Sequence, residues 1–370
     1  MKKFLIINSA KNIEQSFFDL LADLGTENYF FIWSAENFPE TIANGEIEKK
    51  SFPPEPDSFF SFLFFIFSLS FFWPKYFFAL SALKRRESIE KIICVREREK
   101  IIFQPLAKLL KIKIIWFALP GEQDNKFKKL LKISAKSAVV VTFTASETEK
   151  LLQSGCQPEN IHNISLGLNL KTAERQENIF SSLAKADKPY SFYKNFTVGV
   201  ICKDGDRRSL EILLQAVKRC LNLIPNFRLV VLGQDPSNDN LNWLIKNLGL
   251  TGRVWLLGEE KDLAQWFKDL DLYVVLAENP GLNDLEKAIA AASCGVPLLG
   301  WTEKNLSAII SEGQNGCLLA ETGAEAIAQK IIAIESDERL RRIMGINGQK
   351  IVEEQFNRGK QIERLRETLG

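Results

Sequence analysis

The chain has 370 residues, of which 46% are hydrophobic and 25% are charged, and its formal net charge is +2. At about 100–200 residues per domain, this length predicts two domains, and the hydrophobic fraction excludes a chain that is disordered throughout. The near-zero net charge predicts no nucleic-acid partner. Six cysteines without a C-x-x-C pair are typical of a reduced, cytoplasmic protein, and a single histidine, His162, excludes a zinc site with several histidine ligands.

The first apolar run, Phe4–Ile7, follows two lysines and is only four residues long. A secretory signal needs an apolar region of about 7–15 residues. We therefore expect this run to be the first buried strand of an α/β domain rather than a signal peptide.

Short apolar runs alternate with stretches of helical periodicity, such as Leu210–Leu223, along nearly the whole chain. This alternation predicts parallel sheets that helices cover on both faces, in an α/β fold. The expected strands are Phe4–Ile7, Ile92–Val95, Ile112–Phe117, Ala138–Phe143, Thr197–Cys202, Arg228–Leu232, Val254–Leu257, Leu272–Ala277 and Val296–Gly300.

A polar and charged segment, Lys171–Asn195, separates two complete series of strands and helices. We expect a domain boundary within it, which gives an N-terminal domain of residues 1–187 and a second domain of residues 188–355. In parallel sheets, ligands bind beyond the C-terminal ends of the strands.

Residues 58–86 combine a phenylalanine-rich run with basic residues. The run Phe59–Trp73 stops at Pro74, and Lys84, Arg85 and Arg86 follow it. Charge changes sign here, because residues 1–74 hold 5 basic and 10 acidic side chains whereas residues 75–136 hold 16 basic and 6 acidic ones.

Two interpretations of this segment compete. In one it is a buried helix whose basic residues lie on a solvated rim. In the other it is a membrane-surface helix whose aromatic face enters the interface while the basic cluster meets anionic lipid, at about 1 kcal/mol for each basic residue. The density of phenylalanine favours the second. We do not expect a helix that spans the membrane, because Pro74 and Lys75 interrupt a run of 15 residues and a span needs about 20.

The stretch Asp271–Gly300 predicts a strand, a loop from Glu278 to Asn283, a helix to about Cys294 and a further strand. Asn283 or Asp284 is expected to cap the helix at its N-terminus, and Gly295 to end it.

Two carboxylates flank this predicted helix start, with Glu278 at the carboxyl end of the strand and Glu286 in the first turn of the helix. Free N–H groups at a helix N-terminus favour an anion, so the arrangement predicts a phosphate-bearing ligand whose hydroxyls donate hydrogen bonds to Glu286. The alternative is that both glutamates only complement the helix dipole.

The pattern Glu278-x7-Glu286, with the turn Ser293–Pro297 after it, resembles the E-x7-E signature of retaining GT-B glycosyltransferases of family 4, also called group 1. Five further segments resemble the family in order and spacing, and the resemblance covers roughly residues 90–355. They are Ala138–Leu152, Ile164–Asn169, Phe227–Gly233, Leu250–Gly258 and Asn315–Leu319.

The resemblance implies a GT-B architecture of two Rossmann-like domains with parallel sheets that face each other across a cleft. It implies that the N-terminal domain takes the acceptor, that the second domain binds a nucleotide sugar, and that residues 356–370 form a helix packing back on the N-terminal domain. The implied activity is that of a retaining, hexosyltransferase-like enzyme.

The resemblance also assigns roles at the sugar end of the donor site. Glu278 would lie against the donor sugar and near the charge that develops at the anomeric carbon. Glu286 would bind the ribose hydroxyls. Gly281 and Leu282 would offer backbone N–H groups to the diphosphate or the sugar, at a position where a side chain on residue 281 would block a close approach.

Basic residues after the strand Thr197–Cys202 would neutralise the leaving diphosphate. By the family's spacing, Lys203 and Arg208 take this role, with Arg207 as the substitute. Two positions at the ends of neighbouring strands, Gly233 and Leu257, complete the expected substrate-binding set.

The sequence departs from the family pattern in three places. Asn279 and Pro280 change two of the four positions that begin at Glu278, and Pro280 lacks an N–H. The family's glycine-rich loop after the first strand is replaced by Ser9–Asn12, which contains no glycine, and the segment Trp116–Glu122 lacks the family's acceptor-side histidine. Two alternatives therefore stay open: a degenerate protein that binds nucleotide sugars or partner enzymes without turnover, and another GT-B enzyme such as a sugar-nucleotide epimerase.

We expect no cofactor and no metal, and we interpret the two D-x-D triplets, Asp204–Asp206 and Asp269–Asp271, as coincidental. The expected partners are a nucleotide sugar, a glycolipid or oligosaccharide acceptor and a membrane surface, in polysaccharide or glycolipid biosynthesis. The expected location is the cytoplasm, peripheral on the inner face of the cell membrane.

Overall fold

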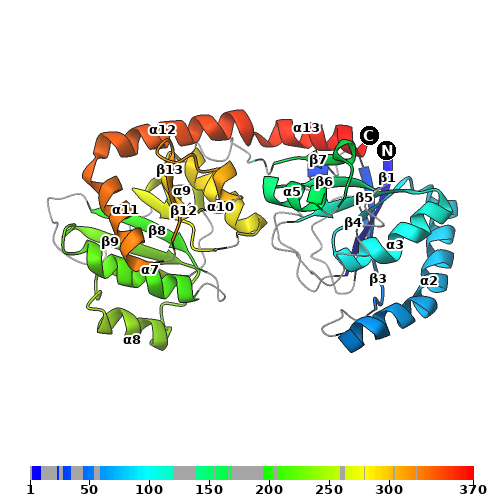
Figure 1. Ribbon diagram of the computed structural model, residues 1–370, viewed down its shortest axis with the longest axis horizontal. Helices are drawn as coiled ribbons and strands as arrows, with labels where there is room; N and C mark the ends of the chain where they lie inside the picture. The colour runs from blue at the N-terminus through cyan, green and yellow to red at the C-terminus, as the bar shows by residue number, and fades with distance from the viewer. Residues whose placement is uncertain are drawn as a thin grey trace. The chain divides into compact units, whose positions relative to one another are not determined.

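The computed structural model describes residues 2–9, 23–24, 28–34, 45–53, 59–119, 138–153, 155–165, 167, 195–202, 207–258, 263–278, 280–302, 305–321 and 323–370. The chain forms two compact units (Figure 1). Unit 1 comprises Met1–Ser165 and Gln361–Gly370, and unit 2 comprises Leu166–Lys360. The units therefore divide 22 residues before the expected boundary at 187/188, which lies outside the described residues.

Unit 1 contains a parallel sheet of seven strands in the order β3-β2-β1-β4-β5-β6-β7. The predicted first strand is confirmed, and the structure adds β2, β3 and β7 to the set named from the sequence. The strands are β1 (Lys2–Asn8), β2 (Asn28–Ser34), β3 (Gly45–Lys49), β4 (Lys91–Cys94), β5 (Lys113–Ala118), β6 (Val139–Thr142) and β7 (Ile161–Asn163).

The described helices of unit 1 are α2 (Phe59–Glu87), α3 (Glu97–Leu110), α5 (Ala145–Gln153) and the 3-10 turn Pro158–Asn160. The closing helix α13 (Arg358–Leu369) begins in unit 2 and, from Gln361 on, belongs to unit 1. There Leu365 and Leu369 are buried, and Arg366 donates to the carbonyl of Asp23 at 3.3 Å.

The expectation that Pro74 interrupts the phenylalanine-rich segment is wrong, because α2 continues through it for 29 residues. An interior proline costs a helix about 3 kcal/mol or more. Burial compensates for that cost here, since Phe65, Leu69, Tyr76 and Leu80 of one face pack into the core of unit 1. Trp73 adds a hydrogen bond from its indole N–H to the carbonyl of Ile102 on α3.

Unit 2 contains a parallel sheet of six strands in the order β10-β9-β8-β11-β12-β13. The strand order reverses between β8 and β11, and such a switch point opens a crevice for ligands at the carboxyl ends of the strands. The strands are β8 (Phe196–Ile201), β9 (Phe227–Leu232), β10 (Val254–Leu257), β11 (Leu272–Val274), β12 (Leu298–Trp301) and β13 (Gly316–Leu319).

Helices of unit 2 connect these strands. They are α7 (Arg207–Cys220), α8 (Asp239–Asn247), α9 (Leu263–Lys268), α10 (Leu282–Ser293), the 3-10 turn Leu306–Ala308, α11 (Ala324–Ser336) and α12 (Glu338–Gln355). The helix predicted over Leu210–Leu223 begins and ends three residues earlier, as α7.

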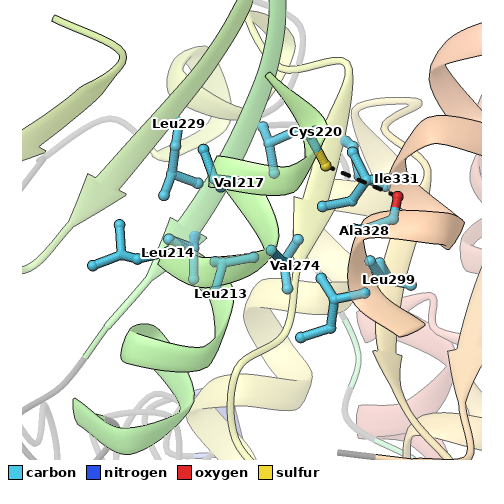
Figure 2. Packing of buried hydrophobic residues seen from close by; sticks show 14 of the residues in the cluster. Leu213, Leu214, Val217, Cys220, Leu229, Val274, Leu299, Ala328 and Ile331 are labelled. Carbon is cyan, nitrogen blue, oxygen red and sulfur yellow. Dashed lines mark hydrogen bonds between the residues drawn. The ribbon is translucent and has the colours of Figure 1, made fainter. Parts of the chain in front are cut away.

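The core of unit 2 lies between its sheet and the adjacent helices α7 and α11 (Figure 2). Leu213 and Val217 of α7 pack with Leu229 and Val274 of the sheet, and the thiol of Cys220 lies 3.9 Å from the carbonyl oxygen of Ala328 on α11. These buried side chains pack the strands against the helices, and this packing sets the positions of the strand ends.

Candidate functional site

The candidate site of unit 2 lies at the carboxyl ends of its strands. Hydrogen bonds to backbone carbonyls bring the ends of β8, β9 and β10 together there. Gly233 donates to the carbonyl of Leu257 at 3.0 Å, and the side chain of Gln234 donates to the carbonyl of Cys202 at 3.2 Å. Gly233 has φ +85°, and a Cβ there would lie 2.9 Å from the Cys202 oxygen. The structure thus brings the predicted residues Gly233 and Leu257 to one edge, and a side chain at 233 would strain it.

The basic residues expected at the diphosphate lie next to this edge, at the start of α7. Arg207 and Arg208 are its first two residues and both are exposed. Arg207 donates to Glu211 one turn later at 3.2 Å, whereas Arg208 has no carboxylate partner in the described part of the chain. Arg208 is therefore the better placed of the two to meet an anion. Lys203 lies outside the described residues.

The loop that carries Glu278 is held by the neighbouring strand. β11 ends at Val274 rather than at the expected Ala277, and the indole N–H of the buried Trp301 donates to the carbonyl of Leu276 at 3.0 Å. Pro280 is buried, while Glu278 is exposed two residues beyond the Trp301 anchor. Glu278 thus lies exposed just beyond an anchored backbone carbonyl, after the strand that borders the switch point of the sheet.

The helix α10 begins earlier than the sequence suggests, and neither Asn283 nor Asp284 is its cap. Gly281 occupies the N-cap position, with φ −79° and ψ −178°. Its N–H donates to the Asp284 carboxylate at 3.1 Å, so Asp284 instead closes the first turn from inside. The intrahelical ladder starts with the N–H groups of Asp284 and Leu285 on the Gly281 carbonyl, which leaves the N–H of Leu282 ahead of it.

The N–H of Gly281, expected to face the diphosphate or the sugar, has a partner within the helix. This N–H already faces a carboxylate, and Asp284 brings a negative charge to the helix terminus where the sequence predicts a phosphate. The donor role of the Leu282 N–H stays a prediction, and the Leu282 side chain is buried. An anion at this terminus therefore competes with Asp284.

Glu286 lies in the second turn of α10, not the first, and it faces a residue that the sequence analysis missed. Its Oε1 is 3.9 Å from Nη1 of Arg358, with 26% and 20% of the two side chains exposed. The same guanidinium nitrogen donates to the carbonyl of Gly167 at 3.5 Å. No spacing in the sequence could reveal this pair, because its members are 72 positions apart in the chain.

In the triplet Asp269–Asp271, the last aspartate is bound to the backbone of β8. The N–H of Thr197 donates to the Asp271 carboxylate at 2.9 Å, and the Asp271 N–H donates back to the Thr197 carbonyl at 2.8 Å. Both residues lie at the amino ends of the strands, away from the site. The described residues hold no group of three or more acidic, histidine or cysteine side chains that could bind a metal ion, and Asp204 and Asp206 are outside them.

In unit 1, Ser9 is the described residue of the segment that replaces the family's glycine-rich loop. Two charged side chains of α3 bind it. The carboxylate of Glu99 accepts hydrogen bonds from the N–H of Ser9 at 2.5 Å and its hydroxyl at 2.7 Å, as well as from Val95 and Arg96. Nε of Arg98 donates to the Ser9 hydroxyl at 2.6 Å, and a terminal nitrogen donates to the Ser9 carbonyl. Burial raises the pKa of Glu99, although these hydrogen bonds oppose the shift.

Sequence reasoning missed this cluster as well, because Ser9 and Glu99 are 90 residues apart. Of the segment without a histidine, Trp116–Glu122, only residues 116–119 are described. The indole N–H of Trp116 donates to the buried side chain of Gln104 at 3.0 Å, which makes this aromatic residue part of the core. His162 lies in β7 and is half-buried.

Comparison with known protein families gives one match, to glycosyl transferases group 1, over residues 189–351. The matched region is less than half of the chain and coincides with most of unit 2. It contains the ends of β8 to β11 and the whole of α10, so every described residue of the candidate donor site lies inside it.

Among curated proteins, the chain is similar to three bacterial enzymes of sugar transfer. It is 25% identical over 253 residues to N-acetyl-alpha-D-glucosaminyl L-malate synthase of Bacillus anthracis, covering 66% of this chain and 63% of the relative. It is 26% identical to the lipopolysaccharide core biosynthesis glycosyltransferase LpsE of Rhizobium meliloti, covering 41% and 43% of the two chains. The capsular polysaccharide biosynthesis glycosyltransferase CapM of Staphylococcus aureus is 23% identical, with 59% and 57% covered. The matches span less than two thirds of each relative.

Among solved structures, the whole chain superposes on Anabaena Alr3699/HepE in complex with UDP, with a TM-score of 0.76, 16% identity and coverage of 100% and 99%. A glycosyltransferase from Rickettsia africae has a TM-score of 0.76, 15% identity and coverage of 99% and 97%. At these identities the structural likeness shows the fold alone, which is the two Rossmann-like parallel-sheet domains of the GT-B glycosyltransferases. The match to glycosyl transferases group 1, over residues 189–351, lies in the second of these domains.

Proposed function

We propose that this protein is a retaining glycosyltransferase that moves a sugar from a nucleoside diphosphate to a glycolipid or oligosaccharide acceptor. The observation that carries the proposal is the arrangement of Glu278, Leu282 and Glu286 around the N-terminus of α10, at the switch point of a group 1 domain. The names of LpsE and CapM favour an acceptor from polysaccharide or lipopolysaccharide synthesis.

The proposed mechanism rests on positioning and on stabilisation of the leaving diphosphate. Arg208 and Lys203 supply positive charge, and the N–H of Leu282 supplies a preorganised donor at a helix terminus. Glu278 faces the sugar, where its carboxylate stabilises the positive charge that develops at the anomeric carbon. Glu286 accepts hydrogen bonds from the ribose. This chemistry requires no metal ligand from the protein.

The first test is binding of UDP, GDP, ADP, CDP and dTDP, measured by thermal shift and titration calorimetry. Since the solved relative HepE binds UDP, we expect UDP to bind. A ligand at 100 times its dissociation constant stabilises a protein by about 2.7 kcal/mol. If none of the five nucleotides shifts the unfolding temperature of the protein, the donor site is absent and the proposal is wrong.

The second test is turnover. With the bound nucleotide's sugars and an extract of membrane glycolipids, Glu278→Gln is expected to lose about 10²–10³ in rate while its nucleotide affinity stays within about threefold. NMR of the product gives the anomeric configuration, and inversion would contradict the proposed retention. Epimerised nucleotide sugar formed without acceptor would indicate an epimerase instead.

One alternative has specific support: a protein that binds nucleotide sugars without turnover. The buried Pro280 provides no N–H, and the N–H of Gly281 is taken by Asp284. Binding of a nucleotide sugar with neither transfer nor hydrolysis across the acceptor set would support this alternative.

We also propose that α2 holds the protein on a membrane surface. Opposite its buried face, this helix exposes large apolar side chains along one stripe, with Phe60 81%, Phe67 77%, Phe71 73% and Phe78 71% exposed. Leu63–Glu87 is long and apolar enough to cross a membrane by length and composition. Because the opposite face packs in the core of unit 1, we propose that α2 lies in the interface and does not span it.

Positive charge at the end of α2 favours an anionic membrane. Lys84 donates to the carbonyl of Leu110 at 2.7 Å, which holds the ends of α2 and α3 together. The basic residues Arg85, Lys108 and Lys111 near these helix ends are exposed, and so is Leu109, at 67%. The cytoplasmic, inner-leaflet location remains a prediction that follows from this charge.

The membrane proposal is tested by sedimentation with vesicles of phosphatidylglycerol and phosphatidylcholine at low salt. The double variant Phe67→Ser/Phe71→Ser is expected to stay in the supernatant, whereas wild type sediments. Leu223→Ser, which changes an equally exposed apolar residue of unit 2, is the matched control and should sediment like wild type. Equal sedimentation of all three proteins would show that α2 is not the contact.

A further inference from the structure

The chain passes between its two compact units twice, at Ser165–Leu166 and at Lys360–Gln361. Gly167 and Arg358 lie in unit 2, as the second residue after the first crossing and the third residue before the second. They touch through the backbone, because a Cβ added to Gly167 would collide with Cα of Arg358 and lie 2.8 Å from its nitrogen. The two linking segments are thus packed at a point where only glycine fits.

The Arg358 side chain extends from this contact to the donor site. Its Nη1 lies 3.5 Å from the Gly167 carbonyl oxygen and 3.9 Å from Oε1 of Glu286 on α10. Only 20% of the Arg358 side chain and 26% of the Glu286 side chain are exposed to solvent. A partly buried ion pair is screened less by water and salt than an exposed pair, so it orients its partners more firmly.

We propose that Arg358 is a positioning residue for nucleotide binding. It holds the Glu286 carboxylate in the orientation in which this group accepts hydrogen bonds from the ribose hydroxyls. This inference rests on the proposed function, because it requires a ribose at Glu286. Arg358 itself does not touch the donor. A carboxylate offers about four lone-pair sites, so a guanidinium beside one of its oxygens leaves the carboxylate able to accept hydrogen bonds from hydroxyls.

The same contacts couple the donor site to the linking segments. The position of the guanidinium depends on the backbone of residue 358, and that backbone is fixed by the close approach of Gly167. A change at residue 167 therefore reaches Glu286 through Arg358, although residue 167 has no side chain near the nucleotide. Coupling of this kind is reciprocal: nucleotide binding stabilises the packing of the two linking segments.

The test is the dissociation constant of UDP, measured by calorimetry on the full chain. Arg358→Ala is expected to raise it about fivefold, which corresponds to about 1 kcal/mol, and Gly167→Ala is expected to raise it in the same direction. The double variant should be no weaker than the weaker single variant, because both act through one contact. Arg364→Ala, at an exposed position of the same helix, is the matched control and should bind UDP like wild type.

A readout specific to positioning uses 2′,3′-dideoxy-UDP, which has no ribose hydroxyl for Glu286. Wild type and Arg358→Ala should bind this analogue equally, whereas a general loss of structure would weaken both nucleotides. Arg358→Lys keeps the charge and should recover part of the UDP affinity. In turnover, Arg358→Ala should raise KM with little change in kcat.

The outcomes separate the inference from the proposed function. If Glu286→Ala weakens UDP binding and Arg358→Ala does not, the positioning role is wrong and the donor site stands. An equal loss of affinity for UDP and for the dideoxy analogue in Arg358→Ala would also overturn it. If wild type binds none of the five nucleoside diphosphates, the proposed donor site fails, and the positioning role fails with it.

Discussion

At two places where a ligand could meet free backbone N–H groups, a single carboxylate already binds those groups. At the end of β1, Glu99 gathers four hydrogen bonds in a site with no exposure to solvent. At the start of α10, Asp284 takes the N–H of Gly281. In each place a carboxylate satisfies backbone donors that a ligand could otherwise use, so the sites differ from a bare glycine-rich loop or a bare helix terminus.

Replacement of Glu99 by glutamine should be costly. The NH2 group of the new amide would face some of the N–H and O–H donors that now point at the carboxylate, so we expect the free energy of unfolding to fall by about 2–4 kcal/mol. Denaturant titration measures the change. Glu90→Gln, at an exposed position, should alter stability by less than about 0.5 kcal/mol; a similar loss in both variants would contradict the role given to Glu99.

Glu99 also gives the stability a pH dependence. Burial raises its pKa above the ordinary value of 4.5, so the folded protein holds this proton more tightly than the unfolded chain does. The stability that this group contributes is complete below pH 4.5 and is lost as the pH rises through the raised pKa. The advantage of wild type over Glu99→Gln should therefore shrink with increasing pH, and an advantage that grows over the same range would contradict the shift.

Removal of the Asp284 carboxylate should change stability and binding in opposite directions. Asp284→Ala loses the bond to the Gly281 N–H and about 1 kcal/mol of helix stability, but it frees a donor and removes a negative charge from the proposed diphosphate site. We expect UDP to bind about two- to tenfold more tightly. Asp284→Asn, which keeps an acceptor without the charge, should show the tighter binding at a smaller loss of stability. Weaker UDP binding in both variants would place Asp284 on the ligand instead.

At the scale of elements, packing overrides local preference. α2 contains Pro74 and still runs for 29 residues, since its buried face belongs to the core of unit 1. α12 contains Gly345 and Gly348, which helices disfavour, at its approach to the end of α10. A Cβ on Gly345 would collide with the Gly295 carbonyl oxygen, and one on Gly348 would lie 3.3 Å from that of Ala292.

Because an added Cβ would collide with backbone at Gly345 but not at Gly348, alanine should destabilise the protein at the first position more than at the second. Both substitutions gain up to about 1 kcal/mol of helix propensity. Gly345→Ala must also displace backbone and should cost about 2–4 kcal/mol net, whereas Gly348→Ala should be close to neutral. Thermal unfolding of the two variants checks the order, and equal stability would show that the helices can move apart without loss.

At the scale of the whole molecule, the proposed function gives nucleotide binding to unit 2 and membrane contact to unit 1. The group 1 domain and the described donor-site residues lie in unit 2, while the exposed face of α2 and the Ser9 cluster lie in unit 1. Each unit therefore carries its own proposed contact, with a nucleotide or with a membrane.

Hydrogen exchange can test this division on the intact chain. Saturating UDP should slow amide exchange at the start of α7, around Gly233 and in the first turns of α10, and it should leave β1 to β6 of unit 1 unchanged. Anionic vesicles should slow exchange in α2 without changing α10. Protection of unit 1 by UDP in place of unit 2 would contradict the assignment of the donor site.

The periodicity of the sequence was enough to predict two parallel-sheet domains, the strands of unit 2 and the unit of strand, loop and helix around Glu278. Local rules are sufficient there, because apolar runs, glycines and caps act over a few residues. They reach their limit at the start of α10, where Gly281 and not Asn283 or Asp284 is the cap, and at Pro74, where burial of Phe65 and Tyr76 outweighs a local helix breaker.

Pairs that lie far apart in the chain were decided by the tertiary structure alone. Glu286 with Arg358, Gly167 with Arg358 and Ser9 with Glu99 have no spacing that a pattern could reveal. Which face of α2 is buried depends on the sheet beneath it, since both faces are apolar in sequence. Composition and periodicity thus predicted the fold class and the strand, loop and helix around Glu278, whereas the folded chain determined which charges meet at α10, because long-range contacts form only when the sheets bring them together.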